Sequence, residues 1–224
     1  MGADGLSVKA GREATTAALL VLIGALTEGR KVVLAGESGQ REAQASWGAG
    51  WRDLRTRGVT PWRGTIADGH LGIWAALAAQ PPTAAAQRGG NHRSTHVLDA
   101  GPPKPHAQAR TWGWARPEAE SQAACEEQRA HLVPRSRQLA PKAVERLLDD
   151  GERLVTFSQF PREHGRHRRT THVVESPVAA VRRRTTAAKR FKKVDAATAL
   201  IWKVLQSAAQ PFRRLNTPEL LPAV

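Results

Sequence analysis

Three acidic residues are the side chains of this sequence best suited to metal-assisted chemistry, and two of them are aspartates. Asp4 and Asp68 each precede a glycine and each stand at the C-terminal end of an expected strand, where sites tend to gather in α/β domains. Two carboxylates brought together there repel each other unless a cation joins them, and Mg²⁺ is the hard, oxygen-seeking ion that suits them. The alternative interpretation of each Asp-Gly pair is an ordinary turn.

Glu175 is the third candidate, because it is an isolated acid in the most basic stretch of the chain. It follows the apolar pair Val173-Val174, and only Glu163 accompanies it as an acid between residues 161 and 193. One interpretation is an ion-pair partner for the surrounding arginines. The functional interpretation is a third metal ligand, set where Arg and Lys hold a phosphate backbone.

His92 is a weaker candidate, since a lone histidine is usually structural or exposed. The spacings support neither a Ser-His-Asp arrangement nor a phosphate-binding loop.

The charge balance favours a polyanionic partner. The chain has 34 Lys and Arg against 20 Asp and Glu, a net charge of +14, and nucleic acid is the commonest partner of such a surplus. A merely basic, soluble protein is the alternative. Nine cations of the basic stretch are the candidate residues for binding nucleic acid: Arg168, Arg169, Arg182, Arg183, Arg184, Lys189, Arg190, Lys192 and Lys193.

The elements that must position these residues indicate an α/β fold with a helical insertion. Residues 1–98 alternate between apolar runs and turn signals, with antiparallel strands expected at 19–23 and 31–35 and a buried strand at 65–69. Helices are expected at 41–57 and 71–79. Residues 99–160 form the expected all-helical insertion, with helices at 118–132 and 141–157. Residues 161–224 form a basic C-terminal part, in which a helix is expected at 196–209.

Cysteine usage and hydropathy indicate the cellular compartment of the protein. The single cysteine, Cys125, excludes an internal disulfide and a cysteine-based metal site. We find no signal peptide, and the longest apolar stretch, residues 17–26, is too short to span a bilayer. We therefore expect a cytoplasmic protein without membrane association.

These segments together resemble the Mutator-type insertion-sequence transposases of bacteria, over essentially the whole chain. The family carries an Asp-Asp-Glu triad on a ribonuclease-H-like fold, with a helical insertion between the second Asp and the Glu. Five ordered segments of the sequence carry the resemblance: Asp4-Gly5-Leu6-Ser7-Val8-Lys9, Ile66-Ala67-Asp68-Gly69-His70-Leu71-Gly72, Gln87-Arg88 through Asn91-His92-Arg93, Phe160-Pro161-Arg162-Glu163-His164 followed by Arg169-Thr170-Thr171, and Val174-Glu175-Ser176.

The resemblance implies an enzyme that cuts and joins DNA. Asp4, Asp68 and Glu175 would hold Mg²⁺ or Mn²⁺ for attack on DNA phosphates, first by water and then by a 3′-hydroxyl. His92 would support the region of the second Asp. The implied partners are the terminal inverted repeats of the element, target DNA and further copies of the chain, and the implied location is the bacterial nucleoid. A non-catalytic, basic DNA-binding remnant is the alternative function.

Departures from the family predict an impaired copy. Gly89 and Gly90 replace Cys-Trp, Gly165 and Arg168 replace Trp and Leu, and Ser158, Val178 and His172 replace two aromatics and an Asn. Single T-to-G or A-to-C base changes account for the Trp, Leu, Tyr, Phe and Asn replacements, and they fit the absence of tyrosine. Because the family's amino-terminal DNA-binding half is missing, we also expect the chain to be truncated at its front. We expect it to be poorly folded and inactive in transposition, since large-to-small core changes are costly.

Overall fold

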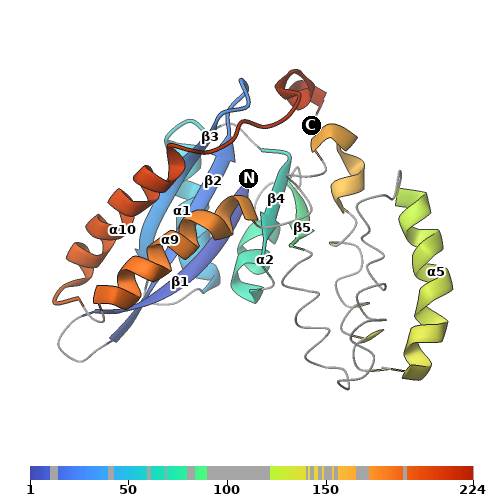
Figure 1. The fold of residues 1–224 in the computed structure, drawn as a ribbon, viewed down its shortest axis with the longest axis horizontal. Coiled ribbons are helices and arrows are strands. Elements are labelled where there is room, and N and C mark those ends of the chain that lie inside the picture. Colours follow the sequence, from blue (N-terminus) through green and yellow to red (C-terminus); the bar gives the residue numbers. More distant parts are fainter. Residues whose placement is uncertain are drawn as a thin grey trace.

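The computed structural model forms a mixed α/β structure around one five-stranded sheet (Figure 1). It describes residues 1–10, 15–39, 43–59, 62–68, 70–79, 84–89, 122–139, 156–164, 172–188 and 191–223, together with residues 141, 144, 145, 148 and 153. The strand order is β3-β2-β1-β4-β5. The strands are β1 (Gly2–Ala10), β2 (Thr15–Ala25), β3 (Lys31–Gly39), β4 (Gly64–Ala67) and β5 (Ala85–Arg88).

The antiparallel half of the sheet is a meander of β1, β2 and β3. The expected pair of strands around 19–23 and 31–35 is confirmed, although both strands are longer than expected. Gly29 has a φ of 81° in the connecting turn, a backbone conformation that glycine adopts without steric cost. A Cβ there would meet Pro218 at 2.8 Å, so the turn also needs glycine for the close approach of the C-terminal segment.

The parallel half consists of β4 and β5, which extend the sheet on the other side of β1. β1 pairs with β4 through two residues only, Gly2 with Ile66 and Ala3 with Ala67. The helix α1 (Gln44–Thr56) precedes β4, and α2 (Leu71–Ala78) connects β4 to β5. Both helices were expected, and the short strand β5 was not.

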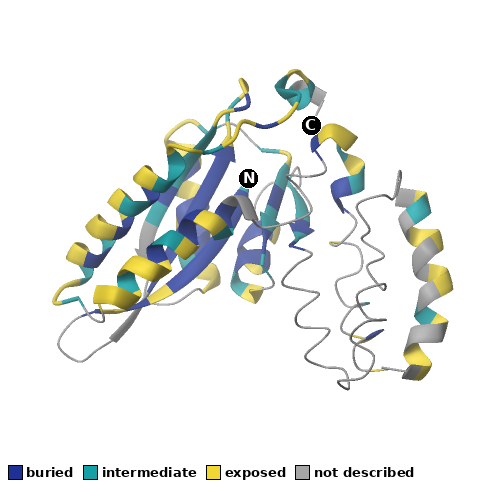
Figure 2. Ribbon diagram, in the orientation of Figure 1, coloured by how far each residue is buried: buried dark blue, intermediate teal, exposed yellow. Residues whose placement is uncertain are grey.

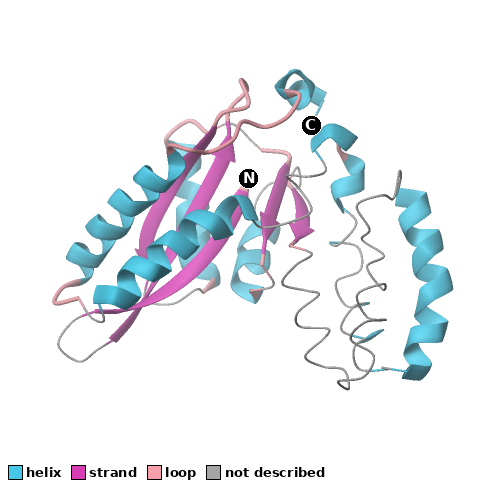
Figure 3. Cartoon of the chain, viewed as in Figure 1, coloured by secondary structure: helices cyan, strands magenta, loops and turns pink. Residues whose placement is uncertain are grey.

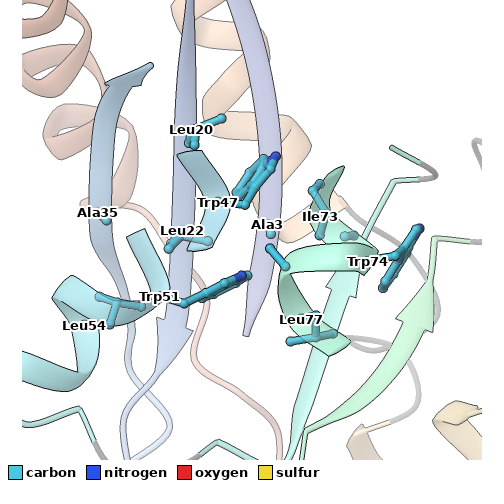
Figure 4. Packing of buried hydrophobic residues seen from close by; sticks show 12 residues of the cluster. Ala3, Leu20, Leu22, Ala35, Trp47, Trp51, Leu54, Ile73, Trp74 and Leu77 are labelled. Atoms are coloured by element: carbon cyan, nitrogen blue, oxygen red, sulfur yellow. The ribbon is translucent and has the colours of Figure 1, made fainter. Parts of the chain in front are cut away.

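One side of the sheet, here called the tryptophan face, is covered by α1 and α2. The side chains of Trp47, Trp51, Leu54, Ile73 and Trp74 pack there against alternate residues of the strands. Figure 4 shows this packing, with Trp47 and Trp51 between α1 and the strands. The two rings are stacked, with centroids 6.2 Å apart.

The opposite side, here called the aliphatic face, is covered by α9 (His172–Ala188) and α10 (Val194–Ala209). In Figures 1 and 3 both helices lie in front of the strands, and α1 lies behind them. Figure 2 shows their outer surfaces as exposed and the strands beneath as buried. The packed side chains are small and branched: Val174, Val178, Val181, Ile201 and Leu205, against Leu6, Val8, Leu19, Val21 and Ile23 of the sheet.

The helix expected at 196–209 is confirmed, since α10 ends at Ala209, and α9 was not expected as an element. Both α9 and α5 (Gln122–Leu139) contain a proline, Pro177 and Pro134 respectively. The expected end of a helix at 132 is wrong, because α5 continues through Pro134.

Most of the expected insertion, including residues 99–121, lies outside the described residues. Its described parts are α5, isolated helical residues between 141 and 153, and the 3-10 turn η1 (Thr156–Gln159). Two further 3-10 turns follow, η2 (Arg162–His164) and η3 (Pro218–Ala223). No helix in the described part of the chain is long and apolar enough to cross a membrane.

Candidate active site

Asp4 lies inside a strand, which corrects the expectation that it ends one. It is the third residue of β1, which continues to Ala10 because β2 pairs with it along its whole length. Strand alternation places Asp4 on the same face as Leu6 and Val8, the aliphatic face. It is only 4% exposed, a degree of burial that is rare for a carboxylate without a functional or pairing role.

Asp68 comes directly after β4, as the sequence predicts. Because Ala3 pairs with Ala67 in the parallel register, Asp4 and Asp68 follow paired residues on neighbouring strands. The carboxylate of Asp68 also accepts a hydrogen bond from the backbone N–H of His70 at 3.1 Å. Asp68 therefore forms a turn into α2, as the alternative interpretation of this Asp-Gly pair expects, and it comes one residue after the paired Ala67.

Glu175 lies in the first turn of α9, where the helix packs onto β1. A Cβ added to Gly2 would lie 3.4 Å from the Cβ of Val174, so the glycine permits a close approach of helix and strand. Val174 is fully buried and Glu175 half-buried. The first turn of α9 is thus fixed two residues from Asp4 along β1, on the face to which Asp4 belongs.

The three carboxylates do not form a ready-made metal site. Among the residues that the structure describes, no group of three or more Asp, Glu, His or Cys side chains is placed to hold a metal ion. The donor set is nevertheless of the right kind, since Mg²⁺ and Mn²⁺ prefer carboxylate oxygens.

Arg88 is a charged residue of this region to which the sequence assigned no role. It ends β5 opposite Ala67, one position before Asp68. Burial lowers the pKa of Arg88, the negative charge of Asp68 raises it, and the positive charge of Arg153 lowers it. A guanidinium nevertheless stays protonated at neutral pH, so Arg88 places a positive charge near Asp68.

The basic residues expected to bind DNA divide into three groups. Arg183, Arg184, Lys192 and Lys193 are exposed. Arg182 donates a hydrogen bond at 3.3 Å to the carbonyl of Gly5, so it also fastens α9 to β1. The remaining site predictions lie outside the described residues: His92, Arg168, Arg169, Lys189 and Arg190.

Together these features define a class of protein: an α/β domain in which one aspartate lies on the central strand and a second follows the parallel strand paired with it, with exposed arginines on a helix that covers the sheet. Comparison with known proteins identifies the family. The model of the Mutator family of transposases matches residues 1–214. The chain belongs to this family.

Individual relatives agree with the family match. The transposase for insertion sequence element IST2 of Acidithiobacillus ferrooxidans is 36% identical over 202 residues, which are 90% of this chain and 68% of the relative. The transposase for IS6120 of Mycolicibacterium smegmatis is 34% identical, over 99% of this chain and 68% of the relative. The transposase for ISRM5 of Rhizobium meliloti is 27% identical, over 82% of this chain and 46% of the relative.

Proposed function

We propose that this chain is the catalytic part of a transposase that cleaves the ends of an insertion sequence and joins them to target DNA. One observation carries the proposal: Ala3 of β1 pairs with Ala67 of the parallel strand β4, so Asp4 and Asp68 each come one residue after a paired position. The half-buried Glu175 is on the helix that packs against the same strand. Family membership supports the same activity, because the relatives are transposases of insertion sequences.

The ribonuclease-H-like fold is part of this proposal. An antiparallel meander of three strands is continued by two parallel strands, and helices cover both sides. In this order the first aspartate lies on the central strand β1 and the second directly follows β4, the parallel neighbour of β1, which supports a two-carboxylate site.

Asp4, Asp68 and Glu175 would hold Mg²⁺ or Mn²⁺ once DNA is bound. The bound ion would neutralise charge on the attacked phosphate and lower the pKa of the attacking water. The carboxylates of this chain would fix the site at the end of the β1–β4 pairing. The exposed Arg183, Arg184, Lys192 and Lys193 would attract the phosphate backbone.

The test is divalent-metal-dependent nicking of DNA that carries the terminal repeats. Asp4→Asn, Asp68→Asn and Glu175→Gln should each abolish nicking while leaving DNA binding in place. Asp195→Asn is the matched control for Glu175, because Asp195 is an exposed acid in the first turn of the neighbouring helix α10. DNA binding without any nicking, both by the unaltered chain and by a variant with the family's residues restored, would favour the alternative, a non-catalytic DNA-binding remnant.

We further propose that this copy is impaired by substitutions at positions where the family has larger side chains. Val178 is fully buried in the aliphatic face, and Ser158 is half-buried in η1. Aromatic rings at such positions bury more apolar area. The reverted variant, defined as Gly89→Cys, Gly90→Trp, Ser158→Tyr and Val178→Phe together, should melt cooperatively and at a higher temperature than the unaltered chain. A sharp transition of the unaltered chain at ordinary mesophile temperatures would contradict the impairment.

A further inference from the structure

We propose that Arg88 and Arg153, with the ring of Trp74 as a support, form a binding site for a DNA phosphate beside Asp68. This inference rests on the proposed function, because it takes DNA as the ligand. It assigns a role to three residues that come from β5, from the end of the expected insertion and from α2.

The aromatic support is the first observation. The guanidinium of Arg153 lies over the ring of Trp74, 5.2 Å from the ring centroid. Arg153 is exposed, whereas Trp74 is only 6% exposed. In Figure 4 the Trp74 ring lies on the side of α2 away from Trp47 and Trp51. A guanidinium stacked by its face keeps its N–H groups available at its edge, and these groups match the oxygens of a phosphate.

The second observation is the fixed position of Arg88. The β4–β5 ladder pairs Arg88 with Ala67, and the N–H of Gly89 donates to the carbonyl of Ala67 at 2.9 Å. Arg88 is close enough to Asp68 and Arg153 for its charge to interact with both. Because the positive charge of Arg153 lowers the pKa of Arg88, the two charges repel each other, and a bound anion would offset that repulsion.

The third observation is a hydrogen bond between the sheet and the turn that follows Arg153. The side-chain carbonyl of Gln87 accepts a hydrogen bond at 2.7 Å from the N–H of Phe157, and Gln87 is 4% exposed. This buried tie joins the strand of Arg88 to the turn that follows Arg153. The residue beside Arg88 is therefore joined to a residue four positions after Arg153, which supports a shared site, since a specific phosphate contact requires a fixed arrangement of its groups.

The position indicates which phosphate is bound. Since Asp68 directly follows β4, the strand next to β5, a DNA strand attacked at the carboxylates would place a neighbouring phosphate over Arg88 and Arg153. Their role would be to position that strand. They would not take part in bond cleavage.

The experiment measures binding to a fluorescein-labelled DNA duplex of arbitrary sequence, at several salt concentrations, in EDTA so that no cleavage occurs. Arg153→Gln should weaken binding about five- to tenfold at 0.1 M salt and reduce the slope of log K against log salt by about 1, as the loss of one phosphate contact does. Arg88→Gln should have a similar effect. Arg137→Gln is the control, because it removes an exposed charge of α5, in the same expected insertion.

A second pair of variants tests whether the ring of Trp74 supports Arg153. Trp74→Leu should weaken binding as Arg153→Gln does, and Trp74→Phe should retain most of the affinity, with circular dichroism showing that both variants are folded. An unchanged slope for Arg153→Gln, or equal losses for Arg153→Gln and Arg137→Gln, would overturn the inference. A reverted variant that binds DNA but never cuts it would overturn the proposed function alone, whereas a reverted variant that does not bind DNA would overturn both.

Discussion

The two faces of the sheet are built from different kinds of side chain. We expect the tryptophan face to contribute more to stability, whereas the aliphatic face carries the candidate catalytic residue Asp4. The tryptophan face carries Trp47, Trp51 and Trp74 around a compact pair of helices. The aliphatic face is filled by valines, leucines and isoleucines, with α9 and α10 above them. The carboxylate of Asp4 belongs to the aliphatic face. Smaller side chains on that face let a helix approach the central strand closely, as Gly2 and Val174 show.

The tryptophan face also contains polar groups that its packing does not satisfy. Trp47, Trp51 and Trp74 each bury an indole N–H for which no described group is an acceptor. Trp62 differs, because its indole N–H donates to the hydroxyl of Thr65 at 2.8 Å. Ring area, rather than hydrogen bonding, is therefore the main contribution of the first three residues to stability.

The largest expected difference between the faces is in the free energy of unfolding. Trp51→Ala should destabilise the domain by about 3–5 kcal/mol, because Trp51 is fully buried and contacts both Trp47 and Trp62. Val181→Ala, at an equally buried position of the aliphatic face, should cost about 2 kcal/mol. Urea unfolding in the reverted variant, followed by circular dichroism, measures both. Equal losses would remove the energetic distinction between the faces.

A smaller effect is expected from the polar contact of the tryptophan face. A double-mutant cycle of Trp62→Phe and Thr65→Val should give a coupling energy of about 1 kcal/mol, because Thr65 is fully buried and its hydroxyl accepts from Trp62. The same unfolding measurement applies. A coupling energy near zero would show that the two residues contribute independently.

The smallest expected effect on stability comes from the arginines above the aliphatic face. Arg182→Gln should lower the free energy of unfolding by no more than about 1 kcal/mol, through the lost bond to Gly5. Arg183→Gln should leave stability unchanged, because Arg183 is exposed. In DNA-binding measurements, each variant should reduce the slope of log K against log salt by about 1. Equal stability of the two variants would mean that Arg182 does not fasten α9 to β1.

The sequence predicted the elements whose patterns are local. The hairpin of β2 and β3, the helices α1, α2 and α10, and the position of Asp68 after β4 follow from hydrophobic runs and turn residues. The family could also be recognised from ordered motifs, because short segments with fixed spacing survive substitutions between them.

The elements that were missed depend on tertiary contacts. α9 contains Pro177, which has no N–H to donate to the carbonyl four residues before it. The many basic residues of this segment also weaken its helical hydrophobic pattern. Val174, Val178 and Val181 form one apolar side of α9, which is recognisable in the structure because it packs against β1. β5 consists of Ala85-Ala86-Gln87-Arg88, a sequence with little strand propensity. No spacing in the sequence indicates that Arg153 lies over Trp74.

β1 and α9, the helix that packs on it, are far apart in sequence, and this separation has a consequence for how the chain folds. The meander of β1, β2 and β3 can form from neighbouring residues, but Arg182 and Gly5 are 177 residues apart in sequence. Closing so long a loop is entropically costly and slow. Until α9 docks, Leu6, Val8 and the other apolar side chains of this face are open to water and to other chains. A chain in that intermediate state is prone to aggregation, so its yield should depend on temperature and concentration during synthesis.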